Sequence, residues 1–266
     1  MVIFKDIKGK KLINVRDMGG LDAFGGKKIA EGRLFRGGRL ADLPLSSAQK
    51  LTKLGIKTEI DLRSDAEVYE HPPVPIDGIE RVWLRTVTTA SDSINDEKTM
   101  RLTLKRESGR IGSEFENGKE YMTEVYRSIL FSDQPKKSLK EFFRIITEAD
   151  APVYFHCNSG KDRTGIFSML LESVLGVSES EIYADYLHSN KRLFLKHAAM
   201  ITLLTIVPLK RAFKSILKAY IRVRKQYLQN VIEELKAKYG SVLNYCKAEL
   251  DLTDGIVETL RGKYLC

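Results

Sequence analysis

The sequence is poor in cysteine. Its 266 residues include only three, Cys157, Cys246 and Cys266, which are odd in number and far apart. That spacing fits neither a disulfide framework nor a cysteine-ligated metal site, and we expect no metal and no cofactor. Free thiols favour a reducing compartment, so a cytoplasmic location is the simplest interpretation. The N-terminal residues MVIFKDIKGKKL lack the apolar segment of a secretory signal. Secretion, or a signal lost from a mature form, stays an alternative.

Long hydrophobic runs are also missing. The longest, AAMITLLTIVP at 198–208, is too short to cross a bilayer as a helix. The chain has no internal repeat and no linker rich in proline, glycine or serine, and its hydrophobic fraction of 43% is ordinary for a globular core. We therefore expect residues 1–266 to form a single domain.

Acidic residues are missing from one long window. From Tyr186 to Ile232 there is no Asp or Glu, whereas ten Lys and Arg residues fall there, in a chain whose net charge is +9. This window holds the whole charge imbalance and predicts an anionic substrate or partner. No nucleic-acid-binding motif accompanies it, so we expect no nucleic-acid partner.

The most informative stretch that is present is HCNSGKDRTG, residues 156–165. The preceding APVYF, 151–155, is apolar and rich in strand formers, while Ile166, Leu170 and Val174 have helical spacing. The stretch is therefore a loop between a strand and the start of a helix. Unpaired backbone N–H groups and the helix dipole favour an anion there.

Several loop residues fit the binding and attack of a phosphate. Cys157 and Arg163 have the spacing C-x5-R, in which a guanidinium fork matches two phosphate oxygens. Gly160 lets the loop curl into an anion nest, where a cysteine has a lowered pKa, and Thr164 can donate a hydroxyl to the sulfur. We expect His156 to orient the loop through hydrogen bonds. The expected substrate-binding residues are Asn158, Ser159, Gly160, Lys161, Thr164 and His156. A buried cysteine beside an ordinary glycine turn is the alternative.

The loop is similar to the signature of the atypical bacterial tyrosine-protein and phosphoinositide phosphatases, a branch of the cysteine-dependent phosphatases. Further blocks resemble this family in family order and cover most of the chain. They are NVRDMGGL (14–21), GRLFRGGRLADL (32–43), GIKTEIDLRS (55–64), YMTEVYRSI (121–129), IYADYLHSN (182–190) and YGSVLNYCKAELDLTDGIVETLRGKYL (239–265). Residues 86–118 and the interior of 191–225 match poorly.

The resemblance implies an α/β fold: a central, mostly parallel sheet flanked by helices, with a helical lid over the pocket. It also implies metal-free hydrolysis of phosphomonoesters, in which Cys157 attacks phosphorus to form a phosphocysteine while Arg163 holds the phosphate oxygens. The expected substrates are phosphotyrosine proteins, inositol phospholipids or both, and we expect a monomer. A catalytically silent module that binds phosphorylated ligands or anionic membranes is the alternative function, and a sulfurtransferase or arsenate reductase is a third.

The leaving alkoxide or phenoxide needs a proton donor, and two aspartates are candidates. Asp162 lies inside the loop, where similar lipid phosphatases carry an aspartate, and we favour it. A structural loop carboxylate that pairs with an arginine is the alternative for Asp162. Asp61 ends a predicted strand, where sheet enzymes place active residues, although a salt bridge or turn with Arg63 is equally compatible. By the same resemblance, Lys161 is expected to contact an additional phosphate on the substrate. A solvated surface lysine is the alternative.

The remaining pattern predicts strands that alternate with helices early in the chain and helices alone later, as in an α/β sheet with a helical cap. The predicted strands are 34–36, 56–64 and 81–84, and the predicted helices are 46–54, 119–131, 136–149, 164–175, 179–196 and one after Thr253. Residues 86–118 are polar and are interpreted as an insertion or flap. We expect Arg16, Asp17 and Asp185 to brace the pocket wall.

Within the acid-free window the spacing predicts a long helix from about 209 to 239, with a basic and an apolar stripe. The basic stripe comprises Lys210, Lys214, Lys218 and Arg222, and the apolar stripe Leu209, Phe213, Ile216, Tyr220 and Val223. We interpret about 191–232 as a basic helical lid, with 198–208 packed near the Cys157 loop, that contacts anionic membranes peripherally. A merely solvated cationic face is the alternative.

Overall fold

The computed structural model describes residues 4–86, 118–194, 198, 201–202 and 211–266, apart from the side chains of 211–213 and 216. Within these residues the centre is a six-stranded sheet with the order β1-β2-β3-β6-β4-β5. The strands are β1 (Lys5–Asp6), β2 (Arg16–Asp17), β3 (Leu34–Gly37), β4 (Thr58–Asp61), β5 (Glu80–Trp83) and β6 (Val153–His156). β3, β6, β4 and β5 run parallel, while β1 and β2 extend one edge antiparallel. The expected mostly parallel α/β sheet is confirmed.

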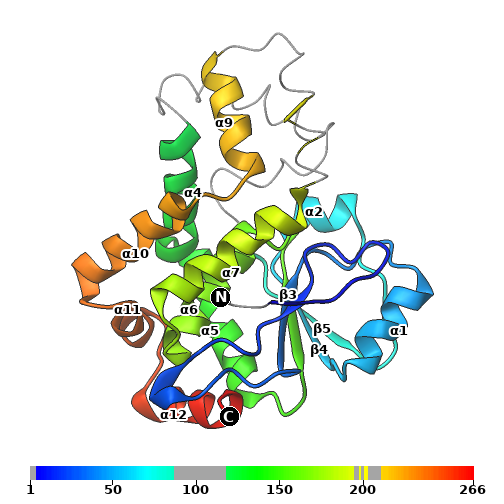
Figure 1. Cartoon of the computed structure of the whole chain (residues 1–266), viewed down its shortest axis with the longest axis horizontal. Helices are drawn as coiled ribbons and strands as arrows, with labels where there is room; N and C mark the ends of the chain where they lie inside the picture. The colour runs from blue at the N-terminus through cyan, green and yellow to red at the C-terminus, as the bar shows by residue number, and fades with distance from the viewer. Residues whose placement is uncertain (1–3, 87–117, 195–197, 199–200, 203–210) are drawn as a thin grey trace.

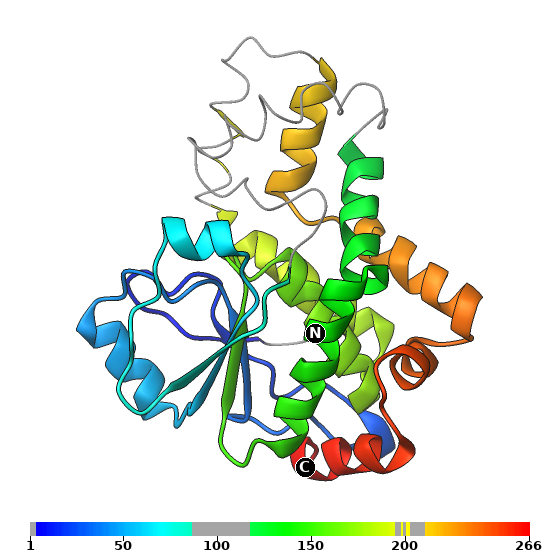
Figure 2. The ribbon, with the colours of Figure 1, turned by 180° about the vertical axis from the view of Figure 1, so that it is seen from behind.

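Helices cover both faces of this sheet. They are α1 (Leu45–Lys53), α2 (Asp65–Glu70), α4 (Gly118–Phe131), α5 (Asp133–Glu148), α6 (Asp162–Leu175), α7 (Glu179–Arg192), α9 (Arg211–Ile221), α10 (Lys225–Tyr239), α11 (Val242–Glu249) and α12 (Asp254–Tyr264). Figures 1 and 2 show α1 on one side of the sheet and α5, α6 and α7 on the other. In both views α4 rises out of that second layer and α9 stands beside its upper end.

The two faces of the sheet enter two separate hydrophobic cores. Along β6, Val153 and Phe155 belong to the larger core, which the helices from α4 to α7 and from α10 to α12 enclose. Tyr154 points the other way, into a smaller core that includes Leu51 of α1. All of β6 is buried, as expected for a parallel strand that is covered on both faces. The loop that begins at Cys157 therefore leaves a strand that is buried on both faces.

The sequence prediction missed several short elements. β1 and β2 have two residues each and offer no detectable alternation. α2 has six residues and begins with a capping box, in which the Ser64 hydroxyl accepts from the Glu67 N–H and the Glu67 carboxylate accepts from the Ser64 N–H. α11 begins after Ser241, whose hydroxyl accepts from the Asn244 N–H.

The prediction of one basic helix over 209–239 is wrong. α9 ends at Ile221 and α10 begins at Lys225. The cause is Asn190 of α7, whose side-chain amide donates to the Val223 carbonyl (2.8 Å) and accepts from the Val223 N–H (3.1 Å). Both backbone groups of Val223 are therefore bound to a side chain rather than to a helix, and the chain turns there.

The described part of the expected lid consists mainly of α9. α9 packs against the N-terminal end of α4, where the Gly118 N–H donates to the Ser215 hydroxyl (3.2 Å). Of the run 198–208, only 198 and 201–202 are described, and they are helical. Lys210, Leu209 and most of the predicted flap at 86–118 lie outside the described residues, as do the side chains of Phe213 and Ile216. No described helix combines the length and apolarity needed to cross a membrane.

Candidate active site

The loop between β6 and α6 holds its carbonyl groups outward. Asn14 donates from its side-chain amide to the Gly160 carbonyl (2.8 Å) and the Ser159 carbonyl (3.3 Å). Arg36 of β3 also donates to the Gly160 carbonyl (3.2 Å). The backbone N–H groups of 158–162 find no acceptor among the described residues. A loop with bound carbonyls and unpaired N–H groups has the character of an anion nest.

A buried ion-pair network supports this loop from below. Arg16 donates to the Asp185 carboxylate through Nε (2.7 Å), and Arg36 pairs with the other oxygen of the same carboxylate. Arg16 also donates to the Asn14 side-chain oxygen (2.8 Å). All of these side chains are buried, and Asp185 joins the two arginines that hold the loop. Asp17 has a different role: it accepts backbone N–H bonds in the neighbouring turn.

Gly160 has a conformation that other residues rarely adopt. Its φ is +68°, and a Cβ placed on it would lie 2.2 Å from the Gly37 carbonyl carbon. The loop thus both curls through the left-handed region and lies directly against the end of β3. Any larger residue at this position forces the loop away from the sheet.

Cys157 is the first residue of the loop and is almost completely buried. Its backbone N–H donates to the Thr164 hydroxyl oxygen (2.8 Å). Burial by itself raises the pKa of the Cys157 thiol, but the Arg163 guanidinium and the Thr164 hydroxyl outweigh burial and lower this pKa below its ordinary value. The surroundings of Cys157 therefore stabilise its thiolate form relative to that of a free cysteine.

Arg163 is held by a carboxylate that the sequence did not single out. The Glu67 carboxylate accepts from Nη1 and Nη2 of Arg163 at 2.6 Å each, in a bidentate pair. Nη1 also approaches the carbonyl groups of Leu62 (3.3 Å) and Thr86 (3.4 Å). Burial lowers the pKa of Arg163, but Glu67 outweighs it and holds this pKa above its ordinary value. The Nε group of Arg163 has no acceptor among the described residues.

His156 lies beneath the loop between two carboxylates. Its Nε2 is 2.9 Å from Glu59, and its Nδ1 is 2.9 Å from the Cys157 carbonyl oxygen and 3.8 Å from Asp61. Burial lowers the pKa of His156, but Asp61 and Glu59 outweigh it and raise this pKa above its ordinary value. A protonated ring donates from both nitrogens, so it fixes the first carbonyl of the loop.

Glu59, Asp61 and His156 are the one His/Asp/Glu cluster among the described residues that has the spacing of a metal site. Their possible ligand atoms lie within 4.8 Å of one another. Their carboxylates are already paired with arginines. Arg63 binds Asp61 and Arg81 binds Glu59 (3.1 Å). The cluster therefore functions as a buried salt-bridge network.

Asp162 lines the space in front of Cys157 as the first residue of α6. One carboxylate oxygen, Oδ1, accepts from the Tyr126 hydroxyl (2.6 Å), and the other, Oδ2, lies 2.6 Å from Lys161 Nζ. Tyr126 in turn lies 2.6 Å from the Tyr186 hydroxyl. Asp162 is the one carboxylate among the described residues that line this space.

Asp61 lies at the end of β4, but it faces the support of the loop rather than its mouth. Arg63 donates to both of its oxygens (2.7 to 3.0 Å) and to Oδ1 again from its backbone N–H. Burial raises the pKa of Asp61, while His156 and Arg63 outweigh it and keep this pKa low. Asp61 is absent from the residues that line the space at Cys157. The geometry matches the salt-bridge interpretation and favours Asp162 as the acid.

Lys161 is buried and does not lie on the solvated surface. Its Nζ donates to the Tyr220 carbonyl of α9 (2.6 Å) and lies 4.7 Å from the centre of the Tyr220 ring. Because the same Nζ contacts Asp162, one cation joins the loop, the candidate acid and α9. The expected second-phosphate contact would have to replace these bonds.

The space in front of Cys157 is closed. It is lined by Val125, Ile129, Cys157, Asn158, Ser159, Asp162, Arg163 and Tyr220, and its volume is about 20 Å³. That is room for about one water molecule. Val125 and Ile129 come from α4 and Tyr220 from α9, so these two helices form the cover. A substituted phosphate does not fit into a space of this size.

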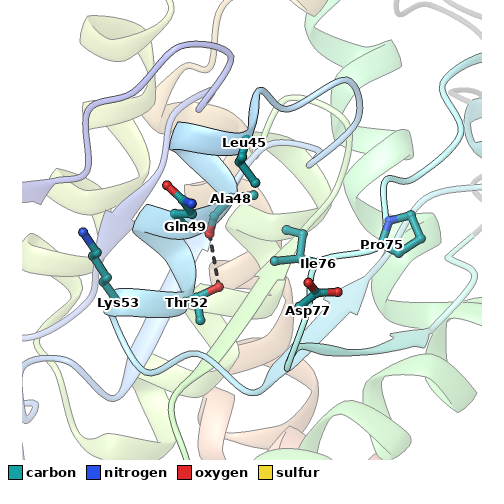
Figure 3. A pocket seen from close by; sticks show the side chains of 8 residues that line it. All are labelled: Leu45, Ala48, Gln49, Thr52, Lys53, Pro75, Ile76 and Asp77. Carbon is teal, nitrogen blue, oxygen red and sulfur yellow. Dashed lines mark hydrogen bonds between the residues drawn. The ribbon is translucent and has the colours of Figure 1, made fainter.

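A larger pocket of about 520 Å³ lies between α1 and the segment 75–77 (Figure 3). Its lining residues are Leu45, Ala48, Gln49, Thr52, Lys53, Pro75, Ile76 and Asp77. The Thr52 hydroxyl donates within its own helix, to the Ala48 carbonyl (3.3 Å). This pocket shares no residue with the space at Cys157 and has no nucleophile beside a cation, so its size does not make it the reactive site.

Two residues that complete the site escaped the sequence analysis. Glu67 is detectable afterwards as the last position of the capping box Ser-Asp-Ala-Glu, 64–67, which marks a helix start directly after β4. Tyr126 has no local signal, because it occupies an ordinary apolar position of α4 and its role depends on a loop 36 residues away.

The fold and the site together define a class. A parallel sheet whose inner strand leads through an anion nest into a helix, with a thiol and an arginine facing each other, has the architecture of a phosphatase. The model of the tyrosine phosphatase family matches residues 7–266, and the chain belongs to this family.

Two bacterial relatives are similar along most of their length. A Cupriavidus necator protein named "Putative tyrosine-protein phosphatase" is 30% identical over 263 residues, which cover 98% of this chain and 88% of that protein. The triple specificity protein phosphatase PtpB of Mycobacterium tuberculosis is 30% identical over 257 residues, covering 89% of this chain and 92% of PtpB. A tyrosine-protein phosphatase of Nostoc commune is 32% identical over 150 residues, covering 56% of this chain and 44% of that protein. The chain is thus a phosphatase by family.

Proposed function

We propose that the protein hydrolyses phosphomonoesters through a phosphocysteine formed on Cys157. The observation that carries this proposal is a buried thiol at the mouth of a loop whose N–H groups at 158–162 have no acceptor among the described residues. The Arg163 guanidinium and the Thr164 hydroxyl lower the pKa of this thiol. The same loop would hold the phosphoryl group of the substrate next to the Cys157 sulfur. Arg163, oriented by Glu67, supplies the cation for the equatorial oxygens.

The reaction has two steps. The Cys157 thiolate attacks phosphorus, the bond to the leaving oxygen breaks, and Asp162 gives its proton to that oxygen. Water then attacks the phosphocysteine, Asp162 takes a proton from it, and the bond between phosphorus and sulfur breaks to release inorganic phosphate. The N–H groups of the loop and Arg163 stabilise the charge that develops in both transition states.

Substrate entry requires the cover over Cys157 to open. α9 is tied to the loop through Lys161 and to α4 through the bond between Gly118 and Ser215. We propose that α9 is part of a lid within the single domain, at about 191–232. The observed space of about 20 Å³ supports this function, because it excludes the substrate from the closed state.

Two substrate classes fit the proposed site: phosphotyrosine proteins and phosphoinositides. The apolar wall of Val125 and Ile129 suits an aryl group, and Lys161 offers a cation beyond the first phosphate. Among the relatives, PtpB carries the name of a triple specificity protein phosphatase. A panel of phosphotyrosine peptides and mono- and polyphosphorylated inositol lipids would rank the two classes.

The decisive variant for the proposed chemistry is Cys157→Ser. It should lose turnover of p-nitrophenyl phosphate by at least 1,000-fold, in line with removal of a covalent nucleophile, yet retain phosphate binding by calorimetry, because the loop N–H groups and Arg163 remain. Trapping of a phosphorylated cysteine by rapid acid quench of the wild type would give direct support. Activity of Cys157→Ser within tenfold of the wild type contradicts the mechanism. A wild type that binds but does not turn over leaves the silent binding module as the function.

We also propose that the basic side of α9 and the following turn contacts anionic membranes. Lys218, Arg222 and Arg224 are exposed and Lys214 is partly exposed, without any acidic residue in this window. Each basic residue near an anionic surface contributes about 1 kcal/mol. This placement would bring the lid next to inositol lipid substrates.

Vesicle co-sedimentation tests the membrane contact. Binding should be stronger to vesicles containing anionic lipid than to neutral ones, and should weaken at high salt. It should also fall when Lys214, Lys218, Arg222 and Arg224 are changed to Gln. A control with Lys8, Lys10, Lys53 and Lys57 changed to Gln removes the same charge from exposed positions elsewhere. Equal losses of vesicle binding in both variants would mean that only the net charge of the protein matters. Unchanged vesicle binding in both variants would mean that the basic side of α9 is only a solvated face.

A further inference from the structure

A buried chain of hydroxyl groups ends on Asp162. Tyr126 of α4 donates to Asp162 Oδ1, and Tyr186 of α7 lies against the Tyr126 hydroxyl, both at 2.6 Å. Both tyrosine side chains are almost fully buried, with exposures of 0% and 1%. Residues of three helices, α4, α6 and α7, therefore meet in this chain of hydrogen bonds.

Gly165 makes room for this arrangement. A Cβ on Gly165 would lie 3.0 Å from the Tyr186 ring, which is tighter than ordinary packing. The glycine lets the ring lie directly against the first turn of α6, where Asp162 is located. The ring of Tyr126 meets that of Tyr186 edge-on at 6.3 Å, which fixes the relative positions of the two hydroxyls.

The direction of the hydrogen bonds follows from the number of protons. An ionised carboxylate only accepts, so the single proton of the Tyr126 hydroxyl points to Asp162. Tyr186 must then donate to the Tyr126 oxygen. When Asp162 is protonated for its role as an acid, the proton lies on Oδ2, and Oδ1 still accepts from Tyr126. The chain of hydroxyls can thus bind both protonation states of the acid.

We propose that Tyr126, backed by Tyr186, is the positioning residue of the general acid. It holds Oδ1 on the side away from Cys157 and so presents Oδ2 to the leaving oxygen of the substrate. This inference rests on the proposed phosphocysteine mechanism, in which Asp162 alternates between an acid and a base within each turnover.

The other groups around Asp162 fit this assignment. Lys161 pairs with Oδ2 in this structure, so it must leave Oδ2 before a leaving oxygen can bind there. Burial and the Asp162 charge both raise the pKa of Tyr126 well above its ordinary value, so its hydroxyl keeps its proton while it donates to Asp162. Tyr227 packs edge-on against Tyr126 at 6.1 Å, but its own hydroxyl has no partner among the described residues.

The test compares leaving groups in three tyrosine variants. Tyr126→Phe should lower kcat for phenyl phosphate, a poor leaving group, about tenfold, and for p-nitrophenyl phosphate less than threefold, because only the poor leaving group needs the acid. Tyr186→Phe should show the same pattern with a smaller loss. Tyr227→Phe removes an unpartnered hydroxyl from the same cluster and is the matched control, with both rates within twofold of the wild type. Melting temperatures of all variants separate misfolding from a loss of positioning.

A double variant distinguishes positioning from general damage. In an Asp162→Asn background, Tyr126→Phe should cost no further rate on either substrate, because the group through which it acts is gone. Equal losses on both substrates in the single variant, or the same tenfold loss in the Asn background, would overturn the inference. An active Cys157→Ser variant would instead overturn the proposed function itself. If Cys157→Ser is inactive but Tyr126→Phe slows both substrates equally, the proposed function stands and only the positioning role of Tyr126 is contradicted.

Discussion

The Glu67 carboxylate binds the Arg163 guanidinium through two hydrogen bonds of 2.6 Å, at a buried position behind the loop. Glu67 is the third residue of the short helix α2, and its capping bond to the Ser64 N–H keeps the carboxylate in place. The arginine is therefore oriented by a segment that follows β4, the strand next to β6. The segment after β6 thus supplies the nucleophile and the cation, and the segment after the neighbouring β4 supplies the carboxylate that orients the cation.

Removal of the Glu67 carboxylate charge should show how much the orientation of Arg163 contributes to the rate, beyond the charge of Arg163 itself. Glu67→Gln leaves Arg163 charged but removes the bidentate pair, and kcat/KM for p-nitrophenyl phosphate should fall roughly 100-fold, in the range seen when one stabilising donor of a transition state is misplaced. Glu67 also raises the pKa of Cys157, so its neutralisation should move the pH midpoint of thiol alkylation downward. Glu70→Gln, an exposed change on the same helix, is the control. An unchanged kcat/KM in Glu67→Gln contradicts the orienting role.

The two aspartates should respond differently to amidation. Asp162→Asn should slow phenyl phosphate by about 100-fold and p-nitrophenyl phosphate far less, as expected for a general acid. Asp61→Asn leaves Arg63 without its partner in a buried network, so it should lower the free energy of unfolding by about 3 kcal/mol. Rates with both substrates and urea unfolding curves measure these effects. A leaving-group-dependent loss in Asp61→Asn but not in Asp162→Asn would reverse the assignment.

Lys161 should affect polyphosphorylated substrates most. Lys161→Ala removes the cation that a second phosphate would meet, and kcat/KM for an inositol polyphosphate lipid should fall at least tenfold more than for a phosphotyrosine peptide. The same change breaks the bond to Tyr220. Lys161→Met, which keeps the apolar stem over the Tyr220 ring, separates lost packing from lost charge. Equal losses on the two substrates would limit Lys161 to holding the loop and α9 together.

His156 should make stability depend on pH. Burial lowers its pKa, but Asp61 and Glu59 outweigh burial, so the folded-state pKa lies above the unfolded value of about 6.5. The stabilisation by the charged ring is thus complete below about pH 6.5 and is lost as the pH rises through the higher folded-state pKa. The unfolding free energy of the wild type should exceed that of His156→Gln by about 3 kcal/mol at pH 6. Urea unfolding from pH 6 to pH 9 should show this difference shrink, and a constant difference would mean that the ring is neutral.

The sequence predicted those parts of the site whose determinants are local. β6 and α6 follow from apolar spacing within about twenty residues, and the loop between them follows from the positions of Cys157, Gly160 and Arg163. The resemblance of several blocks to one phosphatase family gave the sheet and the mechanism as expectations. The sheet and the family membership are confirmed, and the roles of individual residues stay predictions.

The parts that could not be predicted depend on distant partners. Glu67 meets Arg163 across 96 residues, and Tyr126 meets Asp162 across 36. The chain turns after α9 where Val223 binds Asn190, which lies 33 residues earlier, whereas the spacing of the basic residues by itself continues in helical register. Helical periodicity records which face of a helix is buried, but it does not record which polar side chain of another element binds there.

The closed space over Cys157 has a kinetic consequence. The thiol is activated and yet covered by α4 and α9, so a small electrophile meets it only during the fraction of time in which the cover is open. At low concentrations of an alkylating reagent, the inactivation rate should rise in proportion to concentration. At high concentrations it should level off at the opening rate of the cover, with the same plateau for reagents of different intrinsic reactivity. The plateau of the inactivation rate of Cys157 would thus measure how fast α4 and α9 move apart from the thiol, in the absence of any substrate.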